Sequence, residues 1–216
     1  MVEGSRVFVE NEKRDAMYKV ATYLVSQFWG KPRDITDGLG VLLLTWNQAF
    51  YRYGGFDFDL LERSLTKNME TLEQFKEREI FSFNEKDADI IKALFNDFLK
   101  ALQNPKGRKS PVAVSKALHL LAPEFFPLWD NNIAKAYGCL WYYSDQAFDK
   151  YFEFMKKMQN LAEDIVRSFM NVKNVDQETA VETIRERCSG NLPFRKSLLK
   201  IIDEYNYAKY TKNWIN

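Results

Sequence analysis

Two side chains of opposite charge, Lys116 and Asp130, stand 14 residues apart in the chain and could together support attack by an amine. Lys116 lies in the run 112–121, which is apolar almost all the way round a helix, and such a helix is normally buried. Burial disfavours a charged ammonium group, so it lowers the pKa of a lysine and frees its amine to act as a nucleophile. A carboxylate beside it would stabilise positive charge that develops on a substrate. The pair therefore indicates nucleophilic catalysis.

Each of these residues also has a structural interpretation. The stem of Lys116 could run past its neighbours and carry the ammonium group to solvent. Asp130 opens a predicted helix over residues 130–137, and aspartate is a common N-cap. The helix dipole stabilises a carboxylate there, so capping and catalysis are compatible. On the Lys116 helix the single histidine, His119, is expected to be a hydrogen-bonded core residue and not a general base.

Helical periodicity dominates the chain and predicts an all-α protein of about ten helices. Ser110 and Pro111 suit the N-cap and the first position of the helix that carries Lys116. The predicted helices cover residues 14–29, 39–53, 60–66, 71–79, 85–102, 110–121, 130–137, 144–172, 177–188 and 193–210. No repeat and no long linker divides them, so we expect one compact unit over residues 1–216.

Composition excludes several classes of protein. Lysine and arginine (31) nearly balance aspartate and glutamate (30), and a net charge of +1 gives no whole-molecule attraction to nucleic acid. Two cysteines, Cys139 and Cys188, are too few for a disulfide framework, and no signal peptide is recognisable, which predicts a cytoplasmic protein. The longest strongly apolar stretch, 38–46, is too short to cross a membrane, so we expect a soluble protein.

The densest basic cluster surrounds one glycine immediately before the Lys116 helix. It consists of Lys106, Gly107, Arg108 and Lys109, followed by the predicted N-cap Ser110. Three cations ahead of a helix N-terminus could bind a phosphate group by charge. A short charged run is also typical of a solvated loop. Any contact of this nearly neutral protein with DNA would have to be local, and this cluster is the place for it.

Two segments together resemble the helix-hairpin-helix DNA glycosylase superfamily, which includes endonuclease III, the mismatch adenine glycosylases and the 8-oxoguanine glycosylases. Residues 126–135, FPLWDNNIAK, look like the family's apolar-Pro-x-x-Asp stretch, and Asp130 matches its catalytic aspartate. Lys116 lies in the helix that corresponds to the one holding the catalytic lysine of the lyase-competent members. Residues 41–48, VLLLTWNQ, resemble the family's early helix. The likeness covers about residues 38 to 140.

The resemblance has two departures. Lys116 and Asp130 are about one helical turn closer in sequence than in the common members. The hairpin motif, Leu-Pro-Gly-Val/Ile-Gly, is replaced by residues 106–111, KGRKSP, with one glycine in place of two. In the family that hairpin offers backbone N–H groups to a DNA phosphate, a contact that residues 106–110 would make here. The four-cysteine motif is absent as well, so no iron–sulfur cluster, metal or other cofactor is expected.

The resemblance implies a monomeric DNA glycosylase with lyase activity that acts on duplex DNA containing a damaged base. The base, 8-oxoguanine first among the candidates, would be extruded from the duplex into a cleft between two helical lobes, 36–139 and 1–35 with 140–216. Lys116 would form a Schiff base with the sugar, and Asp130 would stabilise the charge on it. Asn47 and Gln48 would probe the gap left in the duplex. The residues expected near the base are Trp46, Tyr51, Trp129 and His119.

Two alternatives stay open at this level. Aromatic residues at helical spacing are more often core than a stacking surface. Without the second hairpin glycine, the chain could also be a non-catalytic helical protein that binds DNA or another partner. The mutual position of Lys116 and Asp130 discriminates between enzyme and scaffold, because a catalytic pair must face one cleft.

Overall fold

The computed structural model describes residues 1–189 and 195–215, and over these residues it contains eleven α-helices and no β-strand. The prediction of an all-α protein of about ten helices is therefore confirmed. A π turn, Tyr207–Thr211, extends the last helix. The helices are α1 (Val2–Asn11), α2 (Asp15–Gln27), α3 (Pro32–Trp46), α4 (Gln48–Tyr51), α5 (Phe58–Lys76), α6 (Ala88–Ala101), α7 (Pro111–Leu121), α8 (Asn131–Ala136), α9 (Ala147–Lys173), α10 (Gln177–Ser189) and α11 (Leu198–Asn206).

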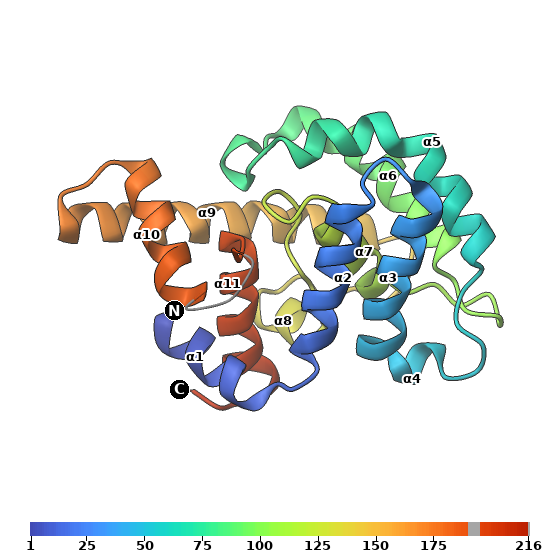
Figure 1. The fold of residues 1–216 in the computed structure, drawn as a ribbon, viewed down its shortest axis with the longest axis horizontal. Helices are drawn as coiled ribbons and strands as arrows, with labels where there is room; N and C mark the ends of the chain where they lie inside the picture. Colours follow the sequence, from blue (N-terminus) through green and yellow to red (C-terminus); the bar gives the residue numbers. More distant parts are fainter. Residues whose placement is uncertain (190–194, 216) are drawn as a thin grey trace.

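The helices form layers around α7 (Figure 1). α2 and α3 lie side by side, α5 packs on α3 and α6, and the long α9 runs behind them with α10 folded back on it. α1 packs against α11, near both ends of the chain. Nine of the eleven residues of α7 are buried, so the prediction that this helix is internal is confirmed. Its N-terminus is the part that reaches the candidate site.

Several helix boundaries differ from the prediction. The helix predicted over 39–53 starts at Pro32 and ends at Trp46, and α4 follows as a separate turn. Proline has the φ angle of a first helical turn, so Pro32 begins α3 and does not mark the end of the preceding helix. The two short helices predicted over 60–66 and 71–79 are one helix, α5, because residues 67–70 continue the helical repeat, with Met69 packed against the core.

Both ends of the chain also depart from the prediction. α1 was not expected, because its apolar contacts come from α11, far away in the sequence. The helix predicted from residue 193 begins at Leu198, where Ser197 accepts the N–H of Lys200 at 3.0 Å as the N-cap. Residues 193 and 194 lie outside the described part of the chain.

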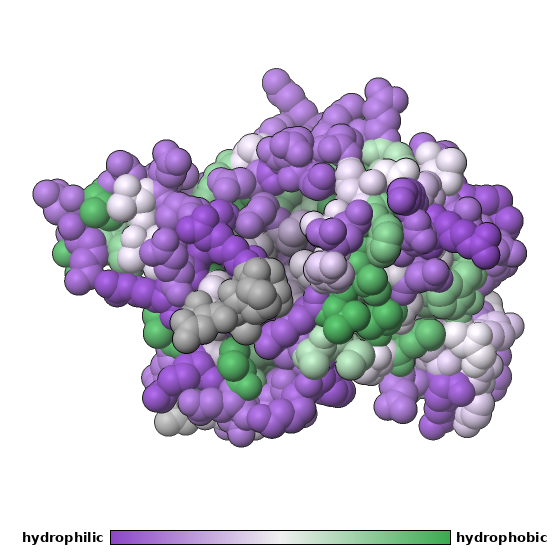
Figure 2. Space-filling model, in the orientation of Figure 1, coloured by the Kyte–Doolittle hydropathy of each residue, from purple (hydrophilic) through white to green (hydrophobic). Residues whose placement is uncertain are grey.

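The division into two lobes at residues 35 and 139 stays a prediction. α2 falls in the lobe predicted over 1–35 and 140–216. It packs along α3, most of which falls in the lobe predicted over 36–139 (Figure 1). The face seen in Figure 2 is mostly hydrophilic, with apolar side chains gathered over α2 and α3. The large apolar residues that these two helices expose are Val20, Tyr23 and Leu44. None of the described helices combines the length and apolarity that crossing a membrane requires.

A buried cluster of charges holds α1 and α2 against α11. The ammonium nitrogen of Lys200 lies 3.4 Å from Asp15, 3.6 Å from Asp203 and 3.5 Å from Glu204. Lys196 makes a 2.8 Å ion pair with the other oxygen of Glu204. Burial alone would lower the pKa of Lys200, but Glu204, Asp15 and Asp203 raise it above its ordinary value. Lys200 is therefore a fixed positive charge inside the protein.

Replacing Glu204 with alanine should lower the free energy of unfolding by about 3 kcal/mol, because two buried ammonium groups lose their shared carboxylate. Urea denaturation followed by circular dichroism measures this loss. Lys67→Ala is the matched control: its ion pair with Asp97 is largely exposed, so its loss should stay below about 1 kcal/mol. Equal losses in the two variants would show that the buried cluster does not hold these helices together.

Candidate functional site

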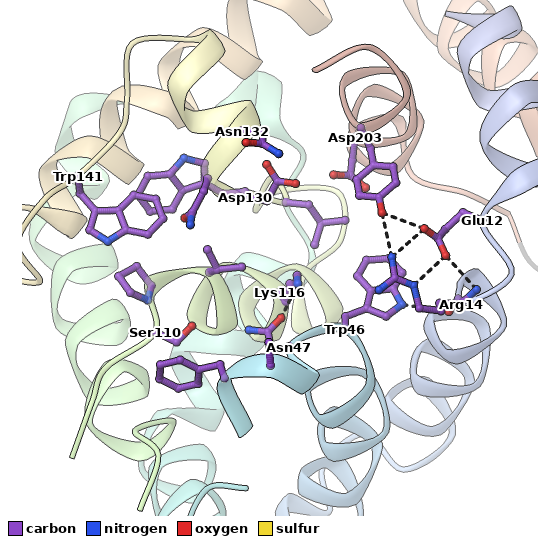
Figure 3. A pocket seen from close by; sticks show the side chains of 18 of the residues that line it. Glu12, Arg14, Trp46, Asn47, Ser110, Lys116, Asp130, Asn132, Trp141 and Asp203 are labelled. Carbon is purple, nitrogen blue, oxygen red and sulfur yellow. Dashed lines mark hydrogen bonds and ion pairs between the residues drawn. The ribbon is translucent and has the colours of Figure 1, made fainter. Parts of the chain in front are cut away.

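A cavity of about 550 Å³ opens where the N-terminus of α7 meets the end of α3, the segment before α8 and the end of α11 (Figure 3). Lys116 and Asp130 both line it, although they come from different elements. Figure 3 shows them around the same cavity, together with Asp203 from α11. The arrangement brings Lys116 and the carboxylates of Asp130 and Asp203 to a single site.

Lys116 is held at its tip by an amide. Its ammonium group donates a 2.5 Å hydrogen bond to the side-chain oxygen of Asn47 and lies 5.5 Å from the centre of the Trp46 ring. Burial lowers the pKa of Lys116 to about 8, against the opposing charges of Asp130 and Asp203. At pH 7 about one molecule in ten then carries a neutral amine, several hundred times more than for an ordinary lysine. The position of this side chain suits a nucleophile.

Asp130 caps α8 and faces the cavity at the same time. One carboxylate oxygen accepts the backbone N–H of Ile133 at 2.7 Å, which makes Asp130 the N-cap. The other oxygen accepts the hydroxyl of Thr211 at 2.9 Å. The two hydrogen bonds fix the carboxylate rigidly, as a group that stabilises charge requires.

Aromatic side chains form much of the cavity wall. Trp46 stacks on Tyr18 at a centroid distance of 5.9 Å, and its ring N–H donates to the carbonyl of Arg14 at 3.0 Å. Trp129, only 1% exposed, packs against Trp141 with ring centres 4.1 Å apart. Trp46, Trp129 and Trp141 all line the cavity. Two of these were predicted near a base, and Trp141 was assigned no role.

Tyr51, His119 and Gln48 do not belong to this lining. The hydroxyl of Tyr51 is turned inward and donates to the carbonyl of Leu102 at 2.7 Å. His119 is fully buried: its Nδ1–H donates to the Phe126 carbonyl at 2.8 Å and its Nε2 accepts the hydroxyl of Tyr18 at 2.9 Å. The prediction that His119 is a hydrogen-bonded core residue is confirmed, and the structure places this side chain outside the cavity lining.

Burial lowers the pKa of His119 to about 3, so this imidazole is neutral at physiological pH and takes no part in the cavity chemistry. Gln48 is exposed and lies outside the cavity wall, one residue beyond Asn47. Of the two polar residues predicted to probe the DNA gap, the structure brings only Asn47 to Lys116.

The loop that carries the basic cluster, residues 106–109, is held by hydrogen bonds to Asn104. The side-chain oxygen of Asn104 accepts the backbone N–H groups of Lys106 and Arg108, each at 3.0 Å. The N–H of Gly107, whose φ is +71°, donates to the backbone carbonyl of Asn104 at 2.8 Å. Three backbone donors that the family's hairpin would offer to a phosphate are thus used inside the loop. Any phosphate contact here must come chiefly from side chains.

The loop reaches the cavity only at its end. Lys109 and Ser110 line the cavity, and the Ser110 hydroxyl accepts the N–H of Ala113 at 3.2 Å, as expected of an N-cap. Lys106 and Arg108 are exposed outside it. The Lys106 ammonium lies 5.2 Å from the ring centre of Tyr53, whose other close cation is Arg52 at 4.6 Å. An exposed aromatic and several cations therefore border the site.

Residues from outside the two predicted motifs complete the cavity. Arg14 donates twice to Glu12, both times at 2.9 Å, and the Tyr207 hydroxyl donates to the same carboxylate at 2.8 Å. The hydrogen bond from Arg14 holds the pKa of Glu12 down at about 2. Asp203 was overlooked, although α11, like α7, carries charged residues in an apolar run. The reasoning that singled out Lys116 would have found it.

No model of a known protein family matches the chain, and no curated protein and no solved structure is similar to it. Over the described residues, the fold and the cavity thus define an all-α protein in which Lys116, Asp130 and Asp203 share one aromatic-walled cavity.

Proposed function

We propose that this protein is a DNA glycosylase with lyase activity, which removes a damaged base through a Schiff base on Lys116. The observation that carries the proposal is the convergence of Lys116 and Asp130 on one cavity, with the lysine pKa lowered by burial. The Lys116 ammonium group has an amide oxygen and the Trp46 ring as its close partners, and it forms no ion pair with the described residues that would hold its charge. The likeness of the two motif segments to the helix-hairpin-helix glycosylases supports the same reaction.

In this reaction the neutral amine of Lys116 attacks the sugar carbon C1′, and the bond from C1′ to the base breaks. The base leaves with the bonding electron pair and takes up a proton. The nitrogen then passes one proton to the ring oxygen O4′ as the ring opens, leaving a protonated Schiff base. The fixed carboxylate of Asp130 stabilises the positive charge that builds up on the sugar as the base departs.

The cavity suits an extruded nucleotide. Its volume of about 550 Å³ falls within the range of small-molecule sites. The partly exposed rings of Trp46 and Trp141 can stack on a base. The base must leave the duplex because its glycosidic bond cannot be reached inside the stack. 8-Oxoguanine is the first lesion to test. In the helix-hairpin-helix glycosylase superfamily, the members that have a catalytic lysine and no iron–sulfur cluster resemble enzymes of oxidised purines most closely.

Borohydride trapping tests the proposal. Wild-type protein is incubated with duplexes carrying 8-oxoguanine, uracil or an abasic site, reduced, and digested for peptide mass spectrometry. We expect a covalent adduct on the peptide that contains Lys116, and the lesions that form it identify the substrate. Absence of any adduct and of any base release, with duplex binding intact, would overturn the enzymatic proposal in favour of a DNA-binding protein.

A separate prediction concerns the exposed basic loop, residues 106–109. Changing Lys106, Arg108 and Lys109 to serine should reduce the slope of log K against log salt concentration by about 0.9 for each residue that contacts a phosphate. Fluorescence anisotropy with an undamaged duplex measures the slope. A control with Lys150, Lys157 and Arg167 changed to serine alters the net charge equally on α9. If both triple variants shift the slope by the same amount, the loop is not the DNA contact.

A further inference from the structure

Asp203 is a second carboxylate in the cavity, and its environment differs from that of Asp130. Both oxygens of Asp130 accept hydrogen bonds, from Ile133 and Thr211. Among the described residues, the carboxylate of Asp203 accepts no hydrogen bond, and its charged contact is the ammonium group of Lys200 at 3.6 Å. It lines the cavity on the α11 side (Figure 3). Asp130 is thus occupied as a hydrogen-bond acceptor, whereas Asp203 has free capacity for a proton.

The cation behind Asp203 is immobile. Lys200 is completely buried, and its ammonium lies 4.3 Å from the ring centre of Phe8 and 4.7 Å from that of Tyr18. Rings and carboxylates together enclose it, so it cannot turn toward the cavity. Asp203 therefore contacts a lysine that stays charged and lines the same cavity as a second lysine, Lys116.

Burial raises the pKa of Asp203 to about 7, with Asp130 and Glu204 acting in the same direction and Lys200 and Lys116 against it. Burial also lowers the pKa of Lys116 to about 8, with Asp130 and Asp203 opposing and Arg14 assisting. Both shifts reduce the difference between the pKa of the Lys116 amine and the pKa of the Asp203 carboxyl group. A proton can consequently pass from one group to the other with little change in free energy, which is the condition for efficient acid–base catalysis.

We propose that Asp203 takes the proton from the Lys116 ammonium group before attack and later gives it to the departing base. This inference rests on the proposed glycosylase function and adds a general acid–base residue to it. Lys116 and Asp203 make no direct ion pair, so the proton leaves Nζ for an oxygen of Asp203 through a water molecule in the cavity. The freed lone pair then forms the bond to C1′, and the bond from C1′ to the base breaks. The base carries away the electron pair and receives the proton from Asp203, which returns to the carboxylate.

Replacing Asp203 with asparagine separates the two steps. Base release from a lesion duplex should fall about 100-fold, because the leaving base has lost its acid. Trapping on an abasic duplex at pH 7, where no base departs, should change less than about threefold, since losing a negative charge lowers the pKa of Lys116 further. Asp203→Glu should restore most of the base release. An equal fall in both activities would mean that Asp203 gives no proton to the departing base, and would overturn its role as the acid.

Asp15→Asn is the matched control, because it removes another carboxylate from Lys200, at 3.4 Å, without touching the cavity. We expect it to destabilise the fold as Asp203→Asn does, yet to leave base release unchanged. If Asp15→Asn slows base release as much as Asp203→Asn, the effect belongs to the buried cluster and not to acid–base chemistry.

A measurement without DNA distinguishes failure of this inference from failure of the proposed function. Competitive acetylation with acetic anhydride, followed by peptide mass spectrometry, gives the fraction of Lys116 labelled at each pH. The midpoint should lie near pH 8 in the wild type and at lower pH in Asp203→Asn. An unchanged midpoint would show that Asp203 does not control Lys116, whether or not the protein acts on DNA.

Discussion

Replacing Lys116 with glutamine should abolish the borohydride-trapped adduct on every duplex, a loss of more than about 10³-fold. The amide nitrogen of glutamine is not nucleophilic, so no Schiff base can form. The side chain is of similar length, and the amide can still bond to Asn47, so the cavity should keep its shape. The fraction of trapped protein on a denaturing gel is the measurement, with thermal unfolding to verify the fold.

Lys109→Gln is the control for this experiment, because Lys109 is exposed and lines the same cavity. Because Lys109 also belongs to the loop expected to bind DNA, protein is kept at a concentration that saturates the duplex, and abasic-site trapping should then stay within about threefold of the wild type. Trapping that survives in Lys116→Gln and disappears in Lys109→Gln would transfer the nucleophile to the exposed lysine. In that case the lowered pKa of Lys116 would serve no chemical purpose.

Replacing Asp130 with asparagine should slow base release by about 10³-fold, because the charge that stabilises the developing cation disappears. Asparagine is as good an N-cap as aspartate and can still accept the N–H of Ile133, so α8 should keep its start at Asn131. Trapping on an abasic duplex should fall much less, since no base leaves there. Single-turnover rates on lesion and abasic duplexes measure the reduction in base release and the reduction in trapping.

Thr211→Val serves as the control for Asp130, because it removes the hydrogen bond to the second carboxylate oxygen but keeps the charge. A reduction in base release below about tenfold is expected. If Asp130→Asn were no slower than Thr211→Val, the aspartate would be a helix cap alone. Asp130→Asn keeps the helix cap and removes the charge, whereas Thr211→Val keeps both and removes one hydrogen bond. The comparison therefore distinguishes the charge of Asp130 from its capping role.

Features that depend on neighbouring residues could be predicted. The apolar run around Lys116 placed this residue on an internal helix, and Ser110 and Pro111 located the start of that helix. Asp130 before a short helix was recognised as an N-cap. Each of these signals extends over four residues or fewer, or over a regular helical repeat, so tertiary contacts were not needed to interpret it.

Features that depend on distant contacts were missed or misplaced. α1 has a weak apolar face that makes sense only against α11. Tyr51 was placed near a base because it is aromatic, but its hydroxyl satisfies the carbonyl at the end of α6. Helical spacing does not reveal which side of a helix faces a cavity and which faces the core, because that depends on the neighbours.

By itself, the sequence determined the helical class, the internal position of the Lys116 helix and the capping role of Asp130, because short-range periodicity and hydrogen bonding decide these. Only the tertiary structure decided that Asn47 holds Lys116 and that Asp203 joins Asp130 around one cavity. Their meeting requires that α3, α7, α8 and α11 pack in one arrangement. That arrangement also sets the burial that shifts the pKa values of Lys116 and Asp203 toward each other.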